Sequence, residues 1–508
     1  MPLLVRLAAC LVAGAAAGLS FEPVRLVYLL PLSVAVLTLC CHGISWRRGG
    51  LLGFGFGAAF MLTLLPWLRV IGVDGWVALS LVQAVFYAAL GAGCALVVRL
   101  RGWPVWCAML WVGTEALRGS VPFGGFPWGR LGFATIDTPV APWYAYLGSA
   151  GVGFLVALVG TVLAWALLRV RRAPVGSVAG LLVVLLAAGV AAAFPSPVGP
   201  GPDQDFSPVS VAAVQGNVPG VGMNAFAERR AVLNNHVEAT LDYADAVEAG
   251  EARRADLVVW PENSTDIDPF ADPSVREDIQ DAVDAVGVPT LVGALTRGPD
   301  EEGGYRNVGI VWRPDTGPGE TYAKRHLVPF GEYIPLRDLF SPYIARLEQV
   351  GSDKVPGTEP GALEMDGVTV GDLICFEVAY DGLVRDIVEA GASLVVVQTN
   401  NATYIDTGQV EQQFAISRLR AIETGRYVVV AATNGISGII APDGEVLSRT
   451  DPRTREVLVE SVAPQTELTP AVRFGGLLEV LLGLVGAAAV AAALMPDLRR
   501  RRRHRKGT

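Results

Sequence analysis

Long apolar runs, separated by short polar segments, fill the first 196 positions of the chain and return near its end. Seven runs precede the polar middle of the chain and an eighth follows it. They are Leu3–Leu19, Leu26–Cys41, Leu51–Leu68, Trp76–Val98, Val105–Leu117, Val152–Leu168, Val178–Phe194 and Phe474–Leu494. A helix needs about 20 apolar residues to cross the hydrocarbon core of a bilayer, and most of these runs approach that length. The pattern predicts a multi-span α-helical membrane bundle of about eight transmembrane helices.

From Val209 onward the pattern changes to short β-branched runs that alternate with amphipathic stretches. The strand candidates are Val209–Val214, Leu257–Trp260, Thr290–Ala294, Val308–Trp312, Val368–Ile374, Leu394–Gln398, Tyr427–Ala432, Gly438–Ile440 and Glu456–Glu460. The helix candidates are Ala225–Ala249, Pro273–Ala285, Gly382–Ala390 and Gln409–Thr424. This alternation is typical of an α/β domain.

The two patterns divide the chain into a part expected to lie in the lipid bilayer and a part expected to lie in water. We expect a membrane domain with seven helices over residues 1–196, a Pro- and Gly-rich linker over 197–207 and an α/β domain over 208–466. A C-terminal transmembrane helix over 470–496 and a basic tail over 497–508 follow. The chain is therefore expected to join a membrane part and an α/β part of different character.

Charge separates the same two parts and predicts their orientation. The net charge of −9 is the sum of +14 outside residues 197–470 and −23 inside them. The basic residues lie in short loops that fall on one side when eight spans alternate, and such loops face the cytoplasm. Both termini are then cytoplasmic and the acidic domain is extracytoplasmic. The basic residues form no single patch among aromatic residues, which argues against nucleic acid as a partner.

Cys375 is the one cysteine of the α/β domain, since the other five lie in or beside the apolar runs. A lone cysteine is often a buried small hydrophobic residue, but Cys375 directly follows the strand candidate Val368–Ile374, and strand ends in α/β sheets collect catalytic groups. A thiol nucleophile needs a base and donors for an oxyanion. Glu262 follows another strand candidate and Lys324 could supply a donor; His326 is the alternative base of a Cys-His enzyme.

Three motifs taken in order resemble the nitrilase superfamily, which uses a Glu-Lys-Cys triad. They are Trp260-Pro261-Glu262, Lys324 with Pro329-Phe330-Gly331-Glu332, and Cys375-Phe376-Glu377. With several spans before the domain and one after it, the whole chain is similar to the apolipoprotein N-acyltransferase family of bacteria. Further matching segments are Gln215-Gly216-Asn217-Val218-Pro219, Gly125-Phe126-Pro127-Trp128, Arg418-Leu419-Arg420-Ala421-Ile422-Glu423 and Thr433-Asn434-Gly435.

The resemblance implies an α-β-β-α sandwich and a role for each matched residue. Glu262, Lys324 and Cys375 are the expected catalytic triad, and Glu332, Glu377 and Phe376 are expected to support it. Contacts with substrate are expected from Asn307, Phe340, Tyr343 and Tyr404, with Phe340 and Tyr343 in a candidate lid or membrane-dipping segment, Leu339–Ile344. The sequence has no metal-ligand cluster and no nucleotide-binding loop, so we expect no metal and no cofactor.

The reaction implied by the resemblance is a two-step acyl transfer in the bacterial cell (inner) membrane. Glu262 takes the proton of Cys375, and the thiolate attacks an ester of a membrane phospholipid, while Lys324 and the backbone N–H of Phe376 hold the oxyanion. The free α-amine of a diacylglyceryl-cysteine on an apolipoprotein then attacks the thioester. We expect a multi-pass protein that acts as a monomer, with phospholipid as donor and apolipoprotein as acceptor.

Two other functions fit parts of the pattern. A membrane-tethered amidohydrolase of the nitrilase type would explain the triad but leave the eight spans without a task. A transporter with an extracellular domain would need ionisable residues within its spans, where the chain has few, chiefly Glu115 and Glu479.

Overall fold

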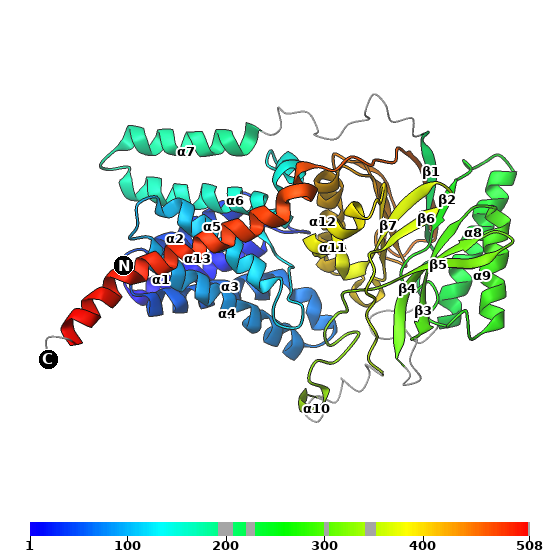
Figure 1. The fold of residues 1–508 in the computed structure, drawn as a ribbon, viewed down its shortest axis with the longest axis horizontal. Coiled ribbons are helices and arrows are strands. Elements are labelled where there is room, and N and C mark those ends of the chain that lie inside the picture. Colours follow the sequence, from blue (N-terminus) through cyan, green and yellow to red (C-terminus); the bar gives the residue numbers. More distant parts are fainter. Residues whose placement is uncertain (191–206, 220–228, 299–303, 341–351, 506–508) are drawn as a thin grey trace. The chain divides into compact units, whose positions relative to one another are not determined.

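The computed structural model describes residues 1–190, 207–219, 229–298, 304–340 and 352–505, with the side chains of Phe340 and of residues 496–505 left undescribed. The chain forms two compact units. One is helical and contains Met1–Ser196 and Arg473–Thr508, whereas the other contains Pro197–Val472 and both sheets (Figure 1). The predicted linker over 197–207 lies almost wholly outside the described residues.

The helical unit consists of apolar helices of different lengths. They are α1 (Leu3–Gly18), α2 (Leu29–Cys41), α3 (Trp46–Leu64), α4 (Val73–Val97), α5 (Trp103–Arg118), α6 (Tyr144–Arg169), α7 (Pro174–Gly189) and α13 (Pro470–Arg505). The segment between α5 and α6 is a long one that contains two turns of 3₁₀ helix, Leu131–Ala134 and Ala141–Trp143. Within the described residues, three helical segments are long and apolar enough to cross a membrane: Val73–Val97, Ala141–Arg169 and Pro470–Met495. Three are shorter apolar helices: Leu3–Gly18, Leu29–Cys41 and Pro174–Gly189. A helix corresponds to every predicted run, but fewer reach spanning length than the eight expected.

Glycine allows α3 and α4 to pack backbone against backbone. A Cβ on Gly49 would lie 2.5 Å from the carbonyl oxygen of Gly91, and a Cβ on Gly53 would overlap the carbonyl of Tyr87. Small residues at helix contacts are how apolar helices gain packing energy where the hydrophobic effect between them is weak. The positions of glycine in these helices therefore favour close packing of particular pairs of helices, such as α3 with α4.

The second unit is built on two six-stranded sheets. The first has the order β12 (Glu456–Val462), β1 (Val209–Gln215), β2 (Leu257–Val259), β3 (Thr290–Arg297), β4 (Tyr305–Arg313) and β5 (Gly317–Ala323). The second has the order β11 (Val446–Arg449), β10 (Gly438–Ile440), β9 (Val428–Ala432), β8 (Leu394–Thr399), β7 (Val368–Ile374) and β6 (Ala362–Met365). In each sheet three adjacent interior strands, β1–β3 or β7–β9, are parallel.

Four layers result from how the apolar side chains alternate along these strands. One face of each sheet contributes to a shared aliphatic core, in which Val211 and Val259 of the first sheet join Val370 and Val396 of the second. The other face of the first sheet packs on α8 (Arg229–Glu248) and α9 (Pro273–Val286). Helices α11 (Asp381–Glu389) and α12 (Gly408–Thr424) pack on the outer face of the second sheet (Figure 1). This is the predicted α-β-β-α sandwich.

Each strand and helix predicted in this unit is present within a few residues of its expected bounds, and three strands were missed. They are β5, β6 and β11, and all three lie at sheet edges. An edge strand is covered less than a central one, so it lacks a continuous apolar run; β5 reads Gly-Pro-Gly-Glu-Thr-Tyr-Ala. An edge strand is defined by its hydrogen bonds to the neighbouring strand, and the local sequence gives little sign of that pairing.

Candidate active site

Cys375 lies at the carboxyl end of β7, where a buried parallel strand passes into a turn of 3₁₀ helix, Cys375–Ala379. Its φ is +58°, in the left-handed region that a side chain with a Cβ rarely adopts. The thiol is half-buried and accepts a hydrogen bond from the Thr399 hydroxyl at 3.4 Å. Burial, followed by the nearby Glu262 carboxylate, raises the pKa of Cys375 to about 12. The resting thiol therefore holds its proton at neutral pH.

Glu262 follows the end of β2 and is 5% exposed. Its Oε1 accepts from Asn307 Nδ2 at 2.7 Å and lies 3.2 Å from Lys324 Nζ. Its Oε2 accepts from the backbone N–H of Asn400, at the end of β8, at 2.8 Å. Donors from both sheets therefore hold this carboxylate in one orientation.

Lys324 follows β5 and is buried between two carboxylates. Its Nζ is 3.2 Å from Glu262 and 3.1 Å from Glu332, whose other oxygen is 3.0 Å from Lys354 Nζ. Burial alone would lower the pKa of Lys324, but the two carboxylates outweigh it and hold that pKa well above its usual value. Burial would likewise raise the pKa of Glu332, but Lys324 and Lys354 lower it to about 2. The site thus contains a permanent cation paired with carboxylates.

Glu377 is fully buried in the turn that follows Cys375 and accepts hydrogen bonds from two segments. It accepts from the Tyr322 hydroxyl at 2.9 Å and from the backbone N–H groups of Arg325 and His326 at 2.8 and 3.0 Å. The N–H of Ile374 donates to its other oxygen at 2.8 Å. Burial raises the pKa of Glu377, and Lys324 and these donors act against that rise. Glu377 therefore joins the segment that bears Lys324 to β7, the strand that ends at Ile374 just before Cys375.

The four residues expected to contact substrate have different surroundings. Asn307 is 1% exposed and donates to both Glu262 and Glu332, so it lies among the buried carboxylates. Tyr404 is half-buried. Burial raises its pKa, and the nearby thiol of Cys375 raises it further. Phe340 ends the short helix α10 (Arg337–Phe340), and Tyr343 lies outside the described residues.

Phe376 directly follows the thiol, and its ring packs edge-on against Tyr380 with centroids 5.4 Å apart. His326 is also close to Tyr380, at 3.7 Å between ring centroids. Its Nε2 is buried and has no hydrogen-bond partner among the described residues. Burial and then Lys324 lower the pKa of His326 to about 4, so its ring is neutral at physiological pH.

Three polar residues around the triad were missed by the sequence analysis. Thr399 and Asn400 end β8 beside the end of β7, so their place after an apolar run, like that of Cys375, could have revealed them. Lys354 follows a segment outside the described residues, and no pattern in the sequence marks it. It reaches Glu332 only through the tertiary fold.

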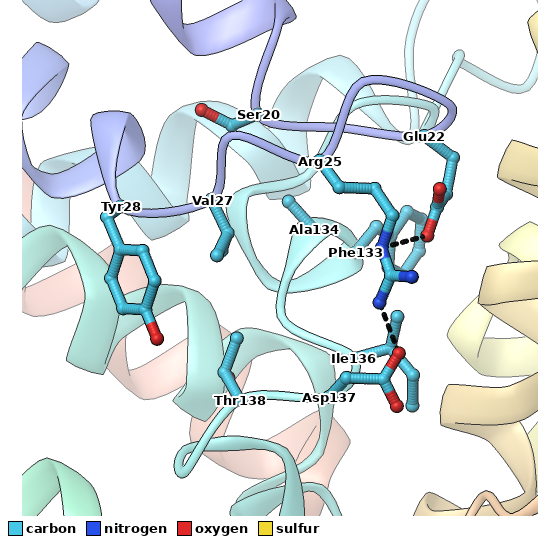
Figure 2. A pocket seen from close by; sticks show the side chains of 10 residues that line it. All are labelled: Ser20, Glu22, Arg25, Val27, Tyr28, Phe133, Ala134, Ile136, Asp137 and Thr138. Atoms are coloured by element: carbon cyan, nitrogen blue, oxygen red, sulfur yellow. Dashed lines mark hydrogen bonds and ion pairs between the residues drawn. The ribbon is translucent and has the colours of Figure 1, made fainter.

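A separate cavity of about 290 Å³ lies in the helical unit. Arg25 reaches into it between Glu22, at 2.9 Å, and Asp137, as Figure 2 shows. Its wall combines these charged groups with Phe133 and Ile136. All three charged side chains belong to the helical unit, so this cavity is distinct from the Glu262–Lys324–Cys375 cluster.

The cluster in the second unit has the parts that acyl transfer requires. It combines a thiol, a carboxylate able to take the thiol's proton and a fixed cation able to stabilise a developing oxyanion. Among the described residues, no group of three or more histidine, cysteine or acidic side chains is arranged to hold a metal ion.

Comparison with known proteins gives matches to both units. Residues 13–162 match the apolipoprotein N-acyltransferase N-terminal domain, and residues 210–470 match the carbon-nitrogen hydrolase family. The apolipoprotein N-acyltransferase of Mycolicibacterium smegmatis is 38% identical, over 96% of this chain and 85% of that protein. That of Chromobacterium violaceum is 30% identical, over 99% of this chain and 96% of that protein. A solved amidase from Nesterenkonia sp. is 19% identical over 53% of this chain and 95% of its own, with a TM-score of 0.37.

Proposed function

Because the chain belongs to the apolipoprotein N-acyltransferase family, we propose that it moves a fatty acyl chain from a membrane phospholipid to an apolipoprotein through a thioester on Cys375. The acceptor is the free α-amine of an N-terminal diacylglyceryl-cysteine. Glu262, Lys324 and Cys375 are the catalytic residues, and Glu332, Glu377 and Phe376 support them.

In the first half-reaction Glu262 takes the proton of Cys375, and the thiolate attacks an ester carbonyl of the phospholipid. The transfer moves a proton within the cluster and leaves its total charge unchanged, and the new thiolate is stabilised by Lys324. Lys324 and the N–H of Phe376 stabilise the oxyanion. Glu262 returns the proton to the departing glycerol oxygen, and the acyl thioester remains.

In the second half-reaction the acceptor amine attacks the thioester carbonyl. Glu262 collects a proton from the amine, the C–S bond breaks and the thiol of Cys375 is restored while an amide forms. One carboxylate thus serves both halves of a ping-pong cycle, and the donors from Asn307 and Asn400 keep it in place for both. Asn307, Phe340, Tyr343 and Tyr404 are our candidates for substrate contacts.

The observation that carries the proposal is the convergence of Glu262, Lys324 and Cys375, from strand ends of two different sheets, in a chain related to N-acyltransferases. Incubation of the purified chain with phospholipid should add the mass of one fatty acyl group to the peptide that contains Cys375. Hydroxylamine should remove it, as expected of a thioester. No adduct on that peptide, under conditions in which lipoprotein is acylated, would contradict the proposal.

A nitrilase-type amidohydrolase is the alternative, and it is not favoured. Residues 13–162 match the N-terminal domain of N-acyltransferases, and the relatives that span nearly the whole chain carry that name. The same matches argue against a transporter, since they extend through the α/β unit with its thiol.

The proposed substrates are lipids, which gives the helical unit a function. We propose an eight-span bundle over 1–196 and 470–496 in the bacterial inner membrane, with both termini cytoplasmic and the domain over 208–466 outside. Drawing an acyl chain into water costs about 0.8 kcal/mol per CH₂, so a site at the bilayer surface avoids a large penalty. We further propose that residues 197–207 are a linker, that residues 497–508 are a basic cytoplasmic tail and that the protein acts as a monomer.

His326→Phe should leave acyl transfer within about threefold of wild type, because Phe keeps the ring contact with Tyr380 and removes only the nitrogens. His326 is neutral above about pH 4 and does not change charge in the working range. The pH profile of kcat between about pH 5.5 and 8 should therefore be unchanged. Loss of thioester formation in this folded variant would instead assign the base to His326.

Glu377→Gln should lower acyl transfer at least tenfold and cost about 1–3 kcal/mol of unfolding free energy. The amide turns one acceptor into a donor that faces backbone N–H groups of Arg325, His326 or Ile374. Thermal unfolding and kcat measured together test this. Glu320→Gln on the exposed part of β5 is the matched control and should change neither. An unchanged Glu377→Gln enzyme would show that the carboxylate does not order this segment.

A further inference from the structure

A further buried carboxyl group, that of Asp372, lies on a strand of the second sheet and has no part in the reaction described above. It is on β7, three residues before Cys375, and it is 0% exposed. Side chains alternate along a strand, so Asp372 shares a face with Val370 and Ile374, which both belong to the aliphatic core between the sheets. Neither carboxyl oxygen of Asp372 has a hydrogen-bond partner among the described residues.

The space for this carboxyl comes from the facing sheet. Gly309 on β4 has no Cβ, and a Cβ built there would overlap Asp372 Oδ2 and lie 2.8 Å from Oε1 of Gln398. Asp372 Oδ2 and Gln398 Oε1 therefore both lie next to the position that a Cβ of Gly309 would occupy. Gln398 Oε1 is likewise buried and without a hydrogen-bond partner among the described residues.

Gln398 connects the two sheets at the catalytic base. Its Nε2 donates to the backbone carbonyl of Trp260 at 2.6 Å, two residues before Glu262. Because a carbonyl only accepts, this contact fixes which end of the amide is Nε2 and which is Oε1. The amide oxygen thus faces Asp372, and two buried acceptors placed together need a proton between them.

We propose that Asp372 is a neutral carboxylic acid in the folded enzyme and that its O–H donates to Gln398 Oε1, which makes Asp372 a positioning residue for the peptide that leads to Glu262. The groups that act on Asp372 agree with this. Burial raises its pKa well above the usual value, and the carboxylates of Glu377 and Glu262 raise it further. The Tyr322 phenol, which also faces Asp372, is neutral because burial raises its pKa.

The protonation state has a consequence for stability that is independent of catalysis. In the unfolded chain Asp372 loses its proton above about pH 3.9, whereas the folded protein keeps it. Because the pKa of Asp372 is higher in the folded state, its contribution to stability is fully present below the unfolded-state pKa. That contribution is lost as the pH rises toward the folded-state pKa. Relative to Asp372→Asn, the folded-to-unfolded ratio of wild type should fall by up to about tenfold per pH unit.

The test compares Asp372→Asn and Asp372→Val in the full chain. Asn can still donate to Gln398 Oε1 and should stay within about twofold of wild-type kcat, whereas Val removes the donor without adding a polar group and should lower kcat about tenfold at unchanged KM. The infrared C=O band of a protonated acid should be present in wild type at pH 7 and absent from both variants. The unfolding temperature of Asp372→Asn should exceed that of wild type increasingly from pH 5 to 8.

Full activity in Asp372→Val, or no protonated-acid band that depends on Asp372 at pH 7, would overturn the inference. The role in positioning Glu262 rests on the proposed function, but the infrared band and the unfolding temperatures do not. If acyl transfer survived loss of Cys375 while the band persisted, the proposed function would fail and the neutral Asp372 would stand.

Discussion

Cys375→Ala is expected to abolish N-acylation of a diacylglyceryl-peptide, with turnover reduced at least about 10⁴-fold. Loss of the nucleophile removes the covalent route, and the remaining groups cannot replace it. Lys324 would still be positioned for an oxyanion, and Glu262 would still be a base, but neither can hold the acyl group between the two half-reactions. The acyl mass on the peptide that contains residue 375 should vanish together with product formation.

Two further variants make this result specific. Cys375→Ser keeps the shape of the side chain, yet its hydroxyl is a far weaker acid than a thiol, so it too should lose most activity. Cys107→Ala removes a buried cysteine of the helical unit and should keep both the acyl adduct and the product. Substantial activity in Cys375→Ala, with the fold intact, would overturn the thioester mechanism.

Glu262→Gln is expected to lower kcat by about 10³-fold with little change in KM, since the effect falls on proton transfer. The pKa of Cys375 is raised to about 12, so the thiol does not ionise by itself at neutral pH and depends on a neighbouring base. Gln has nearly the shape of Glu but cannot accept the proton. Mass spectrometry of the reaction quenched at successive times should show that formation of the acyl adduct slows along with overall turnover.

Glu262→Gln is a clearer test than a change at Lys324. Without Glu262, Lys324 keeps Glu332 as its counter-ion, so the buried cation remains paired. Lys324→Met would leave two buried carboxylates facing each other, and a protein that fails to fold would answer nothing about mechanism. The amide nitrogen of glutamine at position 262 would face either Asn307 Nδ2 or the N–H of Asn400, so the unfolding temperature is measured together with kcat to separate catalysis from folding.

Asp266→Asn is the matched control for the base. Asp266 is an acidic residue of the same segment and accepts from Asn263 Nδ2 at 2.6 Å, and an asparagine oxygen can accept that bond as well. Activity close to wild type is expected. Normal adduct formation by Glu262→Gln, or an equal loss in Asp266→Asn, would contradict the assignment of Glu262 as the base.

Much of the fold could be predicted because burial leaves a local pattern. The interior strands β1, β7, β8 and β9 have parallel neighbours and are largely buried, so they appear as mostly apolar runs, and the amphipathic α9 and α11 were equally visible. Edge strands such as β5 lack that pattern and were missed. In the helical unit the sequence predicted where helices lie better than how long their apolar parts are.

The sequence by itself determined Glu262 and Cys375 as candidates, because both follow apolar runs, and Lys324 through the resemblance of its segment to the nitrilase superfamily. Only the tertiary structure decided which groups surround them. Contacts between residues far apart in the chain, such as Gln398 with Trp260 or Lys354 with Glu332, depend on how two sheets face each other. Charge states depend on the same packing, because burial and neighbouring charges fix them. The sequence thus indicates Cys375 as a candidate nucleophile, and the packing of the two sheets sets the charge states of the acids around it.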